Sequence, residues 1–541
     1  MNAVTSVPKP VNEPVRQYAP GSPERASLEA RVKELAAERV ELTQTIDGVQ
    51  SLGGGEPIDT VQPHRHSHVL GTMRNATAND VAKAVAAAKK AAPAWGALSY
   101  DERAAVFLRA AELLAGPWRG TINGATILGQ SKSVMQAEID SACEFVDFLR
   151  FNVAFGREIL EVQPESSPGI WNRLDYRPLE GFVLAITPFN FTAIAGNIPA
   201  APALMGNTVV WKPSPTQQLA AHFTMRLFEA AGLPPGVINL VTGDGQAVSE
   251  VALVDRDLAG IHFTGSTATF QHLWSTVGGR IGSYRGYPRL VGETGGKDFV
   301  IAHPSADVEA LRTGLIRGAF EYQGQKCSAA SRAYIPASIW SRLESDLIAE
   351  TEALPIGDVT DFANFMGAVI DRRAFDRLAG VIDGIKDDPA LTLLTGGSYD
   401  DSEGFFVRPT IVRATDPTHE VFTKEYFGPV LGVFVYDDAD LDSVVAQAAD
   451  AAPYALTGAV FCTDVGALAA LDRALRFSAG NFYVNDKPTG AVVGQQPFGG
   501  ARASGTNDKA GSHLNLLRWV SPRTIKETLV PPTDWRYPHL G

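Results

Sequence analysis

One of the three cysteines of this chain lies in a turn that suits chemistry better than packing. Cys327 stands in the stretch FEYQGQKCSAASR, where the polar run QGQK precedes it and Ser328 follows it. A free cysteine is most often a small buried apolar residue, and Cys143 in SACEFVDF and Cys462 in AVFCTD fit a helical and a strand core. The polar, glycine-containing turn around Cys327 does not fit such a core. Because a thiolate can add to a carbonyl carbon, Cys327 is the candidate nucleophile.

Two further loops carry side chains that could serve such a nucleophile. Asn190 in TPFNF and Glu293 in GETGG each follow an apolar, strand-like run. Asn190 could be a simple loop cap, and a glutamate like Glu293, taken alone, is more often a solvated loop carboxylate. An amide N–H can nevertheless stabilise an oxyanion, and a partly desolvated carboxylate can act as a general base.

Two more loops, WKPSP and FTGST, could bind a nucleotide. FTGS ends a strand and opens a helix, whose free N–H groups and dipole suit a phosphate, although Ser266 could equally be a plain helix cap. Lys212 could be a surface lysine with a buried stem. The fingerprint G-x-G-x-x-G is missing, and VTGDGQAV keeps only part of it. The fingerprint alone therefore does not establish a nucleotide site.

The elements between these loops alternate regularly. The strand-like runs FVLAI, TVVWKPS, VINLVTG and GIHFTGS are separated by helical patterns, which predicts a parallel α/β sheet with right-handed crossovers. Parallel sheets place ligand sites at the carboxyl ends of their strands, where these loops stand. A second α/β run occupies roughly residues 297–482. Near the start, Ser22 and Pro23 open a charged helix, and further helical patterns begin at Asn79 and Ser99.

Length and composition limit the class of protein. A chain of 541 residues exceeds what one core usually serves, so two or more domains are expected. The formal charge of -13 excludes the electrostatic footprint of a nucleic-acid or anionic-membrane binder. The uncharged residues 181–211 could span a bilayer by length, but prolines and asparagines interrupt them, so we expect no membrane span. Three cysteines and an N-terminus without a signal-peptide core predict a cytoplasmic location.

Together, six motifs resemble the aldehyde dehydrogenase superfamily. PFNF, KPS, FTGS, ETGGK, GQKCS and EYFGP occur in the order and spacing of that family, from about residue 55 to the C-terminus. NEPVRQYAPGSPER, EYQGQKCSAASR and GQQPFGGARASGTNDKAG are similar to one group within it, the Δ1-pyrroline-5-carboxylate dehydrogenases. The resemblance implies NAD-dependent oxidation of L-glutamate 5-semialdehyde, formed from Δ1-pyrroline-5-carboxylate, to L-glutamate in proline catabolism.

The resemblance also implies the catalytic and cofactor residues, with no metal. Cys327 would form a thiohemiacetal and then a thioester, Asn190 and the Cys327 N–H would bind the oxyanion, and Glu293 would activate the hydrolytic water. Six residues match the NAD contacts of the family: Lys212 and Ser214 at the adenosine ribose, Gly265 and Ser266 at the pyrophosphate, and Glu425 and Phe427 at the nicotinamide ribose and ring. Pro215 stands where many NAD-specific relatives carry a glutamate that repels NADP. The choice of NAD over NADP therefore rests on the resemblance to the Δ1-pyrroline-5-carboxylate dehydrogenases rather than on Pro215.

The resemblance places the substrate among residues of three further segments. Backbone amides at Gly490 and Ala491, with the hydroxyl of Ser328, resemble the anchor for the substrate's α-carboxylate. Two aromatic residues and one carboxylate complete the set: Phe191 and Phe498 would pack on the aliphatic middle, and Glu144 would face the ammonium. The helical stretch AEIDSACEFVDFLRF could equally present Glu144 to solvent, and the glycines could be plain turn residues.

The implied architecture is an α/β, aldehyde dehydrogenase-like fold, with a Rossmann-type cofactor domain, an α/β catalytic domain and a small β oligomerisation arm. We predict an N-terminal segment and helix (1–55), an NAD-binding domain (56–165 and 186–292), a catalytic domain (293–490), and an arm with a C-terminal tail (166–185 and 505–541). Residues 169–177 and RTIKETLVPP are typical of extended strands outside the main sheets. In the family such strands cross to a second subunit, so we expect a homodimer or a higher assembly of dimers.

The same residues bear on other possible functions. A dehydrogenase for another ω-semialdehyde, using NAD or NADP, is the main alternative. A non-catalytic binding protein on this scaffold would be expected to lose Cys327, Glu293 or Asn190, and all three are present. A relative that transfers its thioester to coenzyme A is disfavoured because Glu293 is retained. A fusion with a proline-oxidising barrel would need more chain than 541 residues provide, so proline dehydrogenase is expected as a separate functional partner.

Overall fold

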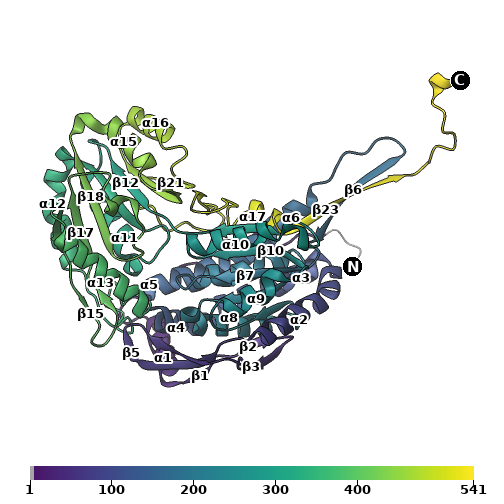
Figure 1. Cartoon of the computed structure of the whole chain (residues 1–541), viewed down its shortest axis with the longest axis horizontal. Coiled ribbons are helices and arrows are strands. Elements are labelled where there is room, and N and C mark those ends of the chain that lie inside the picture. The colour runs from purple at the N-terminus through teal and green to yellow at the C-terminus, as the bar shows by residue number, and fades with distance from the viewer. Residues whose placement is uncertain (1–4) are drawn as a thin grey trace.

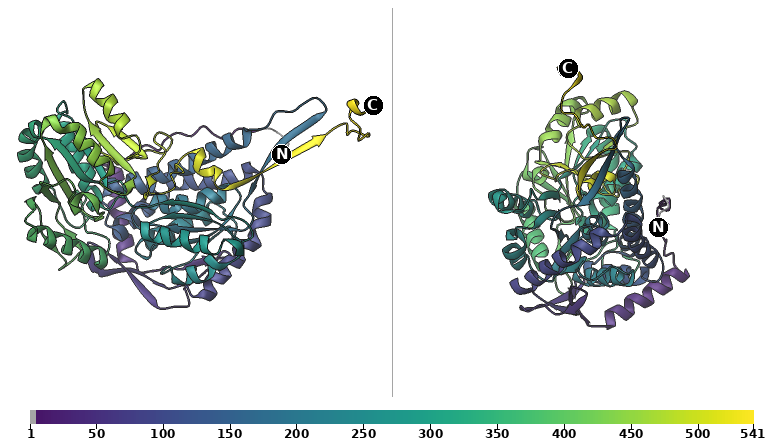
Figure 2. Two further views of the ribbon diagram at one scale, coloured as in Figure 1. Left: turned by 45° about the horizontal axis from the view of Figure 1, so that its top comes forward. Right: turned by 90° about the vertical axis from the view of Figure 1, so that its right-hand side faces the viewer.

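The computed structural model describes residues 5–541, and it has two α/β bodies side by side with a two-stranded ribbon that projects from one of them (Figures 1 and 2). The first body is built on a seven-stranded sheet of order β11-β10-β7-β8-β9-β2-β3. Five of its strands run parallel: β7 (Phe182–Thr187), β8 (Thr208–Pro213), β9 (Ile238–Leu240), β10 (Leu258–Thr264) and β11 (Arg289–Glu293). The predicted parallel sheet is therefore confirmed.

Residues before position 55 also join this sheet. Strand β2 (Gln44–Ile46) pairs antiparallel with β9 and with β3 (Val49–Ser51) at the edge. The predicted separate N-terminal segment therefore contributes an edge of the first body. Strands β1 (Val40–Glu41), β4 (Pro57–Gln62) and β5 (Arg65–Arg74) form a three-stranded sheet next to it.

Helices cover both faces of the first sheet, as the alternation of side chains along each strand requires. Val183 and Ala185 of β7 pack with one set of helices: α3 (Tyr100–Ala115), α4 (Arg119–Gln130), α6 (Phe145–Glu161), α7 (Thr192–Leu204) and α8 (Gln218–Ala230). Phe182 and Leu184 face the other set: α2 (Ala78–Ala97), α9 (Gln246–Val251) and α10 (Thr267–Gly279). The charge-free residues 181–211 are thus a strand, a helix and a strand of a buried layer. Among residues 5–541, no helix has both the length and the apolar character needed to cross a membrane.

The predicted helix starts agree with the caps in the structure. Helix α1 (Pro23–Ala37) begins with Pro23 behind Ser22, whose side chain accepts from Arg25 N–H. Ser99 and Glu102 form a capping box at α3. The helix expected from Asn79 starts one residue earlier, after Thr77.

The second body repeats the arrangement with a sheet of order β14-β17-β18-β13-β12-β20-β21. Its strands are β12 (Asp298–Ala302), β13 (Ala330–Pro336), β14 (Leu391–Thr395), β17 (Thr410–Ala414), β18 (Val430–Tyr436), β20 (Thr457–Phe461) and β21 (Asn481–Val484), and only β14 is antiparallel. Helices α11 (Val308–Phe320) and α12 (Ala337–Glu352) cover one face, and α13 (Arg372–Asp387), α15 (Leu441–Asp450) and α16 (Val465–Ala474) cover the other. This is the second α/β run expected from the sequence.

The projecting ribbon consists of β6 (Ile170–Pro178) and β23 (Val520–Thr528), which pair antiparallel along their whole length (Figure 1). Both strands lie outside the main sheets, as predicted. Two parts of the predicted arm and tail lie elsewhere. Residues 182–185 belong to β7, and α17 (His513–Leu517) contacts α6 in the first body.

Candidate active site

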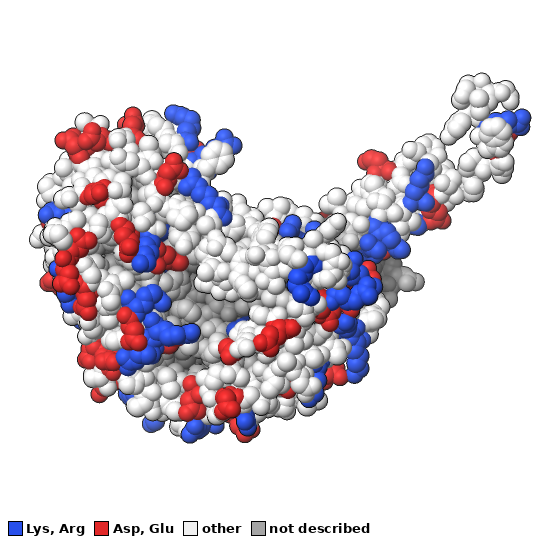
Figure 3. Space-filling model, viewed as in Figure 1, with Lys and Arg blue, Asp and Glu red and all other residues white. Residues whose placement is uncertain are grey.

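A cavity of about 650 Å³ opens between the two bodies at the carboxyl ends of β7, β8 and β10. Figure 3 shows the hollow between the bodies, with acidic and basic side chains interspersed around it. The cavity brings together Cys327, Asn190 and all six predicted cofactor residues: Lys212, Ser214, Gly265, Ser266, Glu425 and Phe427. Residues far apart in the sequence therefore meet at the strand ends, as the parallel sheet predicts.

The turn before Cys327 has an unusual backbone. Tyr322, Gln323 and Gly324 have φ of 53°, 56° and 64°, a region that residues other than glycine seldom adopt. The Gln323 side-chain amide donates to the carbonyl oxygens of Ser131, at 3.0 Å, and Ala368, at 2.6 Å. These contacts stabilise the turn, which leaves Cys327 half-buried on the cavity wall.

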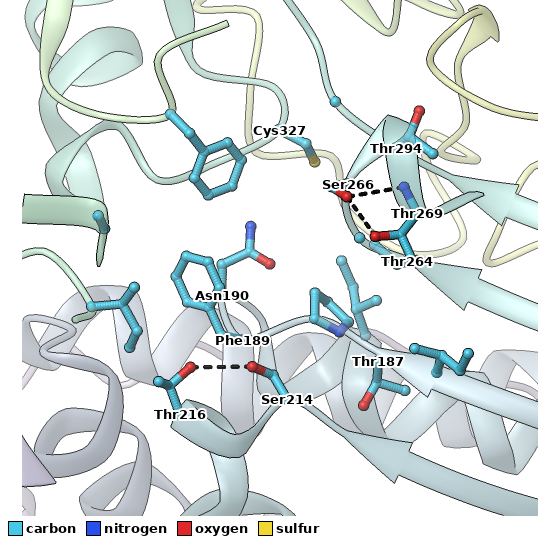
Figure 4. A pocket seen from close by; sticks show the side chains of 18 of the residues that line it. Thr187, Phe189, Asn190, Ser214, Thr216, Thr264, Ser266, Thr269, Thr294 and Cys327 are labelled. Carbon is cyan, nitrogen blue, oxygen red and sulfur yellow. Dashed lines mark hydrogen bonds between the residues drawn. The ribbon is translucent and has the colours of Figure 1, made fainter. Parts of the chain in front are cut away.

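Asn190 is held by that same turn, on the cavity that Cys327 also lines. Its Nδ2 donates to the carbonyl oxygen of Gln325 at 3.0 Å. A side-chain amide has two N–H donors, so a second remains for a ligand. Figure 4 shows the Asn190 amide and the Cys327 thiol facing the same cavity. This arrangement can direct an N–H at an oxygen on the carbon that the sulfur attacks.

Glu293 ends β11 but lies in a second, smaller cavity, together with Glu144 and Phe498. Burial raises the pKa of Glu293 to about 8, and the positive charge of Lys509 opposes this rise. Glu293 Oε1 lies against Gly499. The carboxylate therefore needs to turn out of this cavity to reach a group on Cys327.

Burial also raises the pKa of the Cys327 thiol well above its usual range, and the nearby carboxyl groups of Glu293, Asp298 and Glu425 add to this effect. The thiol therefore holds its proton at neutral pH in this arrangement. A base must remove that proton as the sulfur attacks.

The cavity wall from β8 and α10 offers groups suited to an anion. Lys212 donates to Gly243 O over a long 3.4 Å, which leaves N–H groups for a ligand, and burial lowers its pKa to about 8. Ser266 caps α10 by accepting from Thr269 N–H at 3.2 Å (Figure 4). The predicted cap is thus real, and the start of a 13-residue helix still faces the cavity. A buried ammonium group and a helix N-terminus fit a dinucleotide.

The opposite wall carries Glu425 and Phe427. Glu425 Oε1 accepts from Gly296 N–H at 2.9 Å, and burial raises the pKa of this carboxyl to about 7. Phe427 has φ of 53°, and its ring meets that of Phe189 edge-on, with centroids 5.8 Å apart. Phe189 lines the cavity too, a position not predicted from the sequence, although its place next to Asn190 in PFNF was a signal for it.

Ser328 and Gly490, two of the three predicted carboxylate-anchor residues, are connected by Thr489, for which the sequence predicted no role. Ser328 Oγ hydrogen-bonds Thr489 Oγ1 at 2.8 Å. Thr489 directly precedes Gly490, whose φ of 96° requires a glycine-like conformation. Ala491 follows, partly exposed. The hydroxyl next to the glycine in PTG was the signal for Thr489.

The other predicted substrate residues lie in two places. Glu144 is half-buried and lines the cavity of Glu293 and Phe498. Burial raises its pKa well above the usual range. Phe191 is half-buried and packs under Lys132, a residue to which the sequence reasoning assigned no role.

Comparisons with known proteins agree with this geometry. Residues 50–525 match the family described as "Aldehyde dehydrogenase family". The probable delta-1-pyrroline-5-carboxylate dehydrogenase of Schizosaccharomyces pombe is 47% identical over 535 residues, which cover 97% of each chain. The Mycobacterium tuberculosis Delta-pyrroline-5-carboxylate dehydrogenase bound with NAD is 63% identical and covers 100% of both chains, with a TM-score of 0.97. Proline utilization A (PutA) of Bdellovibrio bacteriovorus is 29% identical and has a TM-score of 0.91, covering 98% of this chain and 55% of that one.

Proposed function

This chain belongs to the aldehyde dehydrogenase family, and we propose that Cys327, Asn190 and Glu293 are the residues with which it oxidises L-glutamate 5-semialdehyde to L-glutamate. The reaction is NAD-dependent and belongs to proline catabolism. The observation that carries the assignment is the shared cavity, in which Cys327 and the Asn190 amide lie with the six residues expected to contact NAD.

The first half of the reaction forms a thioester on Cys327. The Cys327 thiol gives up its proton to water, the sulfur attacks the aldehyde carbon, and the C=O π electrons move to the oxygen. The Asn190 Nδ2–H and the backbone N–H of Cys327 stabilise that oxyanion, which typically contributes ~10²-fold or more per donor. When bound, NAD supplies the two-electron acceptor that converts the thiohemiacetal into a thioester.

The second half releases the acid. The Glu293 carboxylate turns from its cavity toward the thioester and takes a proton from a water molecule, whose oxygen attacks the carbonyl carbon. The C–S bond breaks and Cys327 is regenerated. Glu293 is the last residue of β11, and the segment TGG, with two glycines, follows it.

Six residues of the cavity would hold NAD. The Lys212 and Ser214 side chains would contact the adenosine ribose, and Gly265, Ser266 and the start of α10 would bind the pyrophosphate. Glu425 and Phe427 would contact the nicotinamide ribose and ring. The hydrogen bond of Glu425 to Gly296 N–H orients its carboxylate for this contact.

The substrate end is recognised by its α-carboxylate and α-ammonium groups. The Ser328 hydroxyl and the N–H groups of Gly490 and Ala491 bind the carboxylate, and Thr489 holds Ser328 at that loop. Phe191 and Phe498 pack against the aliphatic carbons. Glu144 faces the ammonium.

Assembly and cellular context complete the proposal. We propose the ranges 56–165 with 186–292 for NAD binding and 293–490 for catalysis, to which residues 44–51 and 182–185 add strands of the first sheet. The β6–β23 ribbon pairs with a second copy of the chain, so we expect at least a homodimer.

Proline dehydrogenase is the proposed functional partner, because its product supplies this substrate. The three free cysteines suit a reducing compartment, and the cytoplasm is proposed.

The decisive experiment compares substrates. We expect kcat/KM for glutamate 5-semialdehyde to exceed that for succinate and adipate semialdehydes, and NAD to be reduced faster than NADP. Cys327→Ala should be inactive with an unchanged circular dichroism spectrum. A preference for a semialdehyde without the amino acid end would favour the alternative ω-semialdehyde dehydrogenase instead.

A further inference from the structure

A buried lysine connects the two loops that form the catalytic site. Lys132 follows α4 and has a relative exposure of 0%. Its ammonium pairs with the Asp140 carboxylate at 2.7 Å. The same nitrogen lies 4.1 Å from the ring centroid of Phe191 and 4.6 Å from that of Tyr322. One charge therefore contacts an aromatic ring from each loop.

Because the Lys132 ammonium is buried, the groups that compensate its charge must stay close to it. A buried ammonium is costly unless it is paired and hydrogen-bonded. Asp140 supplies the opposite charge, and the two ring faces supply cation–π contacts, which are stronger when desolvated. Burial lowers the pKa of Lys132, and the Asp140 carboxylate opposes this. Moving either ring away from Lys132 would leave part of the charge uncompensated.

Asp140 extends the contact to the Asn190 loop. It lies in a short π-helix, Glu138–Glu144, and such segments are frequent at functional sites. Its two oxygens accept the first N–H groups of α7, from Thr192 and Ala193, both at 2.9 Å. These two residues directly follow Asn190 and Phe191. The carboxylate thus fixes both the helix start and the direction of the loop before it.

The Cys327 turn is held from the same side. Tyr322, whose ring contacts Lys132, has the left-handed backbone that opens this turn. Gln323 donates to the carbonyl of Ser131, the residue before Lys132. Residues 131 and 132 therefore contact the turn at two successive positions. Neither Lys132 nor Asp140 lines the cavity that holds Cys327.

We propose that Lys132 and Asp140 are positioning residues that hold the Asn190 loop and the Cys327 turn at the separation needed for thioester formation. The proposal rests on the roles proposed above for Asn190 and Cys327. It goes beyond them in assigning their alignment to an ion pair outside the cavity, which contacts the two loops through Phe191, Tyr322 and the start of α7.

The test is Lys132→Met, which keeps the length of the side chain and removes the charge. We expect the single-turnover rate of thioester formation to fall about 10²-fold, the loss that a misplacement of about 1 Å can cause. NAD affinity, measured by fluorescence titration, should be unchanged, because Lys212 and Ser266 lie on other elements. Lys89→Met, the same change at a surface lysine paired with Asp257, is the matched control.

A second pair of variants covers the case in which Lys132→Met does not fold. Tyr322→Leu should form the thioester more slowly than Tyr322→Phe, because only phenylalanine keeps a ring beneath the ammonium of Lys132. Where Lys132→Met does fold, its rate of Cys327 alkylation by iodoacetamide, followed by mass spectrometry without cofactor, should differ from that of the wild type. This readout reports the position of the sulfur independently of turnover.

Three outcomes would overturn the proposal. They are thioester formation at the wild-type rate in Lys132→Met, equal loss of NAD affinity and acylation rate in that variant, and equal rates in the two Tyr322 variants. The proposed function fails separately, since it requires Cys327→Ala to be inactive. An inactive Cys327→Ala together with a wild-type rate in Lys132→Met would refute the positioning role alone.

Discussion

The rate of thioester hydrolysis should increase with the fraction of Glu293 that is ionised. Burial raises the pKa of this carboxyl from 4.5 to about 8, so its base form appears only as the pH rises through that value. One pH unit below the pKa, roughly one tenth of the molecules carry the carboxylate, and the fraction falls about tenfold with each further unit. We therefore expect the hydrolysis rate to rise about tenfold per pH unit from about pH 6 and to level off above about pH 8.

The assay separates the two halves of the reaction. Enzyme, NAD and substrate are mixed rapidly and quenched with acid, and the acyl group on Cys327 is quantified by mass spectrometry. In Glu293→Gln the thioester should form and then persist. The reasoning is refuted if wild-type hydrolysis is independent of pH over this range, or if Glu293→Gln keeps the same slope. Loss of thioester formation in that variant would instead show that Glu293 also takes the proton of the thiol.

Three further substitutions test the remaining roles. Asn190→Ala should slow thioester formation by about 10²–10³-fold with unchanged NAD affinity, and a normal first turnover would exclude an oxyanion role. Lys212→Ala should weaken NAD binding by roughly 10–100-fold, the equivalent of a lost charged hydrogen bond of about 1.5–3 kcal/mol; calorimetric titration with an unchanged Kd would contradict this. Pro215→Glu should lower kcat/KM with NADP more than with NAD, because its carboxylate repels the 2′-phosphate, and equal losses would place residue 215 away from that phosphate.

Much of the fold could be predicted because the signals are local. Ser22 and Ser99 stand before their helices with the expected caps, and the charge-free runs FVLAI and TVVW form β7 and β8. Strand ends of a parallel sheet meet at one edge, so the sequence alone predicts that the loops with Asn190 and Lys212 lie together.

The sequence by itself therefore determined the type of fold and which loops carry Cys327, Asn190 and Lys212, since each depends on residue type and short spacing. Only the tertiary structure decided the environments of the charged groups. Lys132 and Asp140 are buried as a pair, and Glu293 lies in a cavity apart from Cys327. The pKa values and orientations of such groups depend on charges and rings from distant segments. No local pattern in the sequence encodes which of those segments will exclude water from a given side chain.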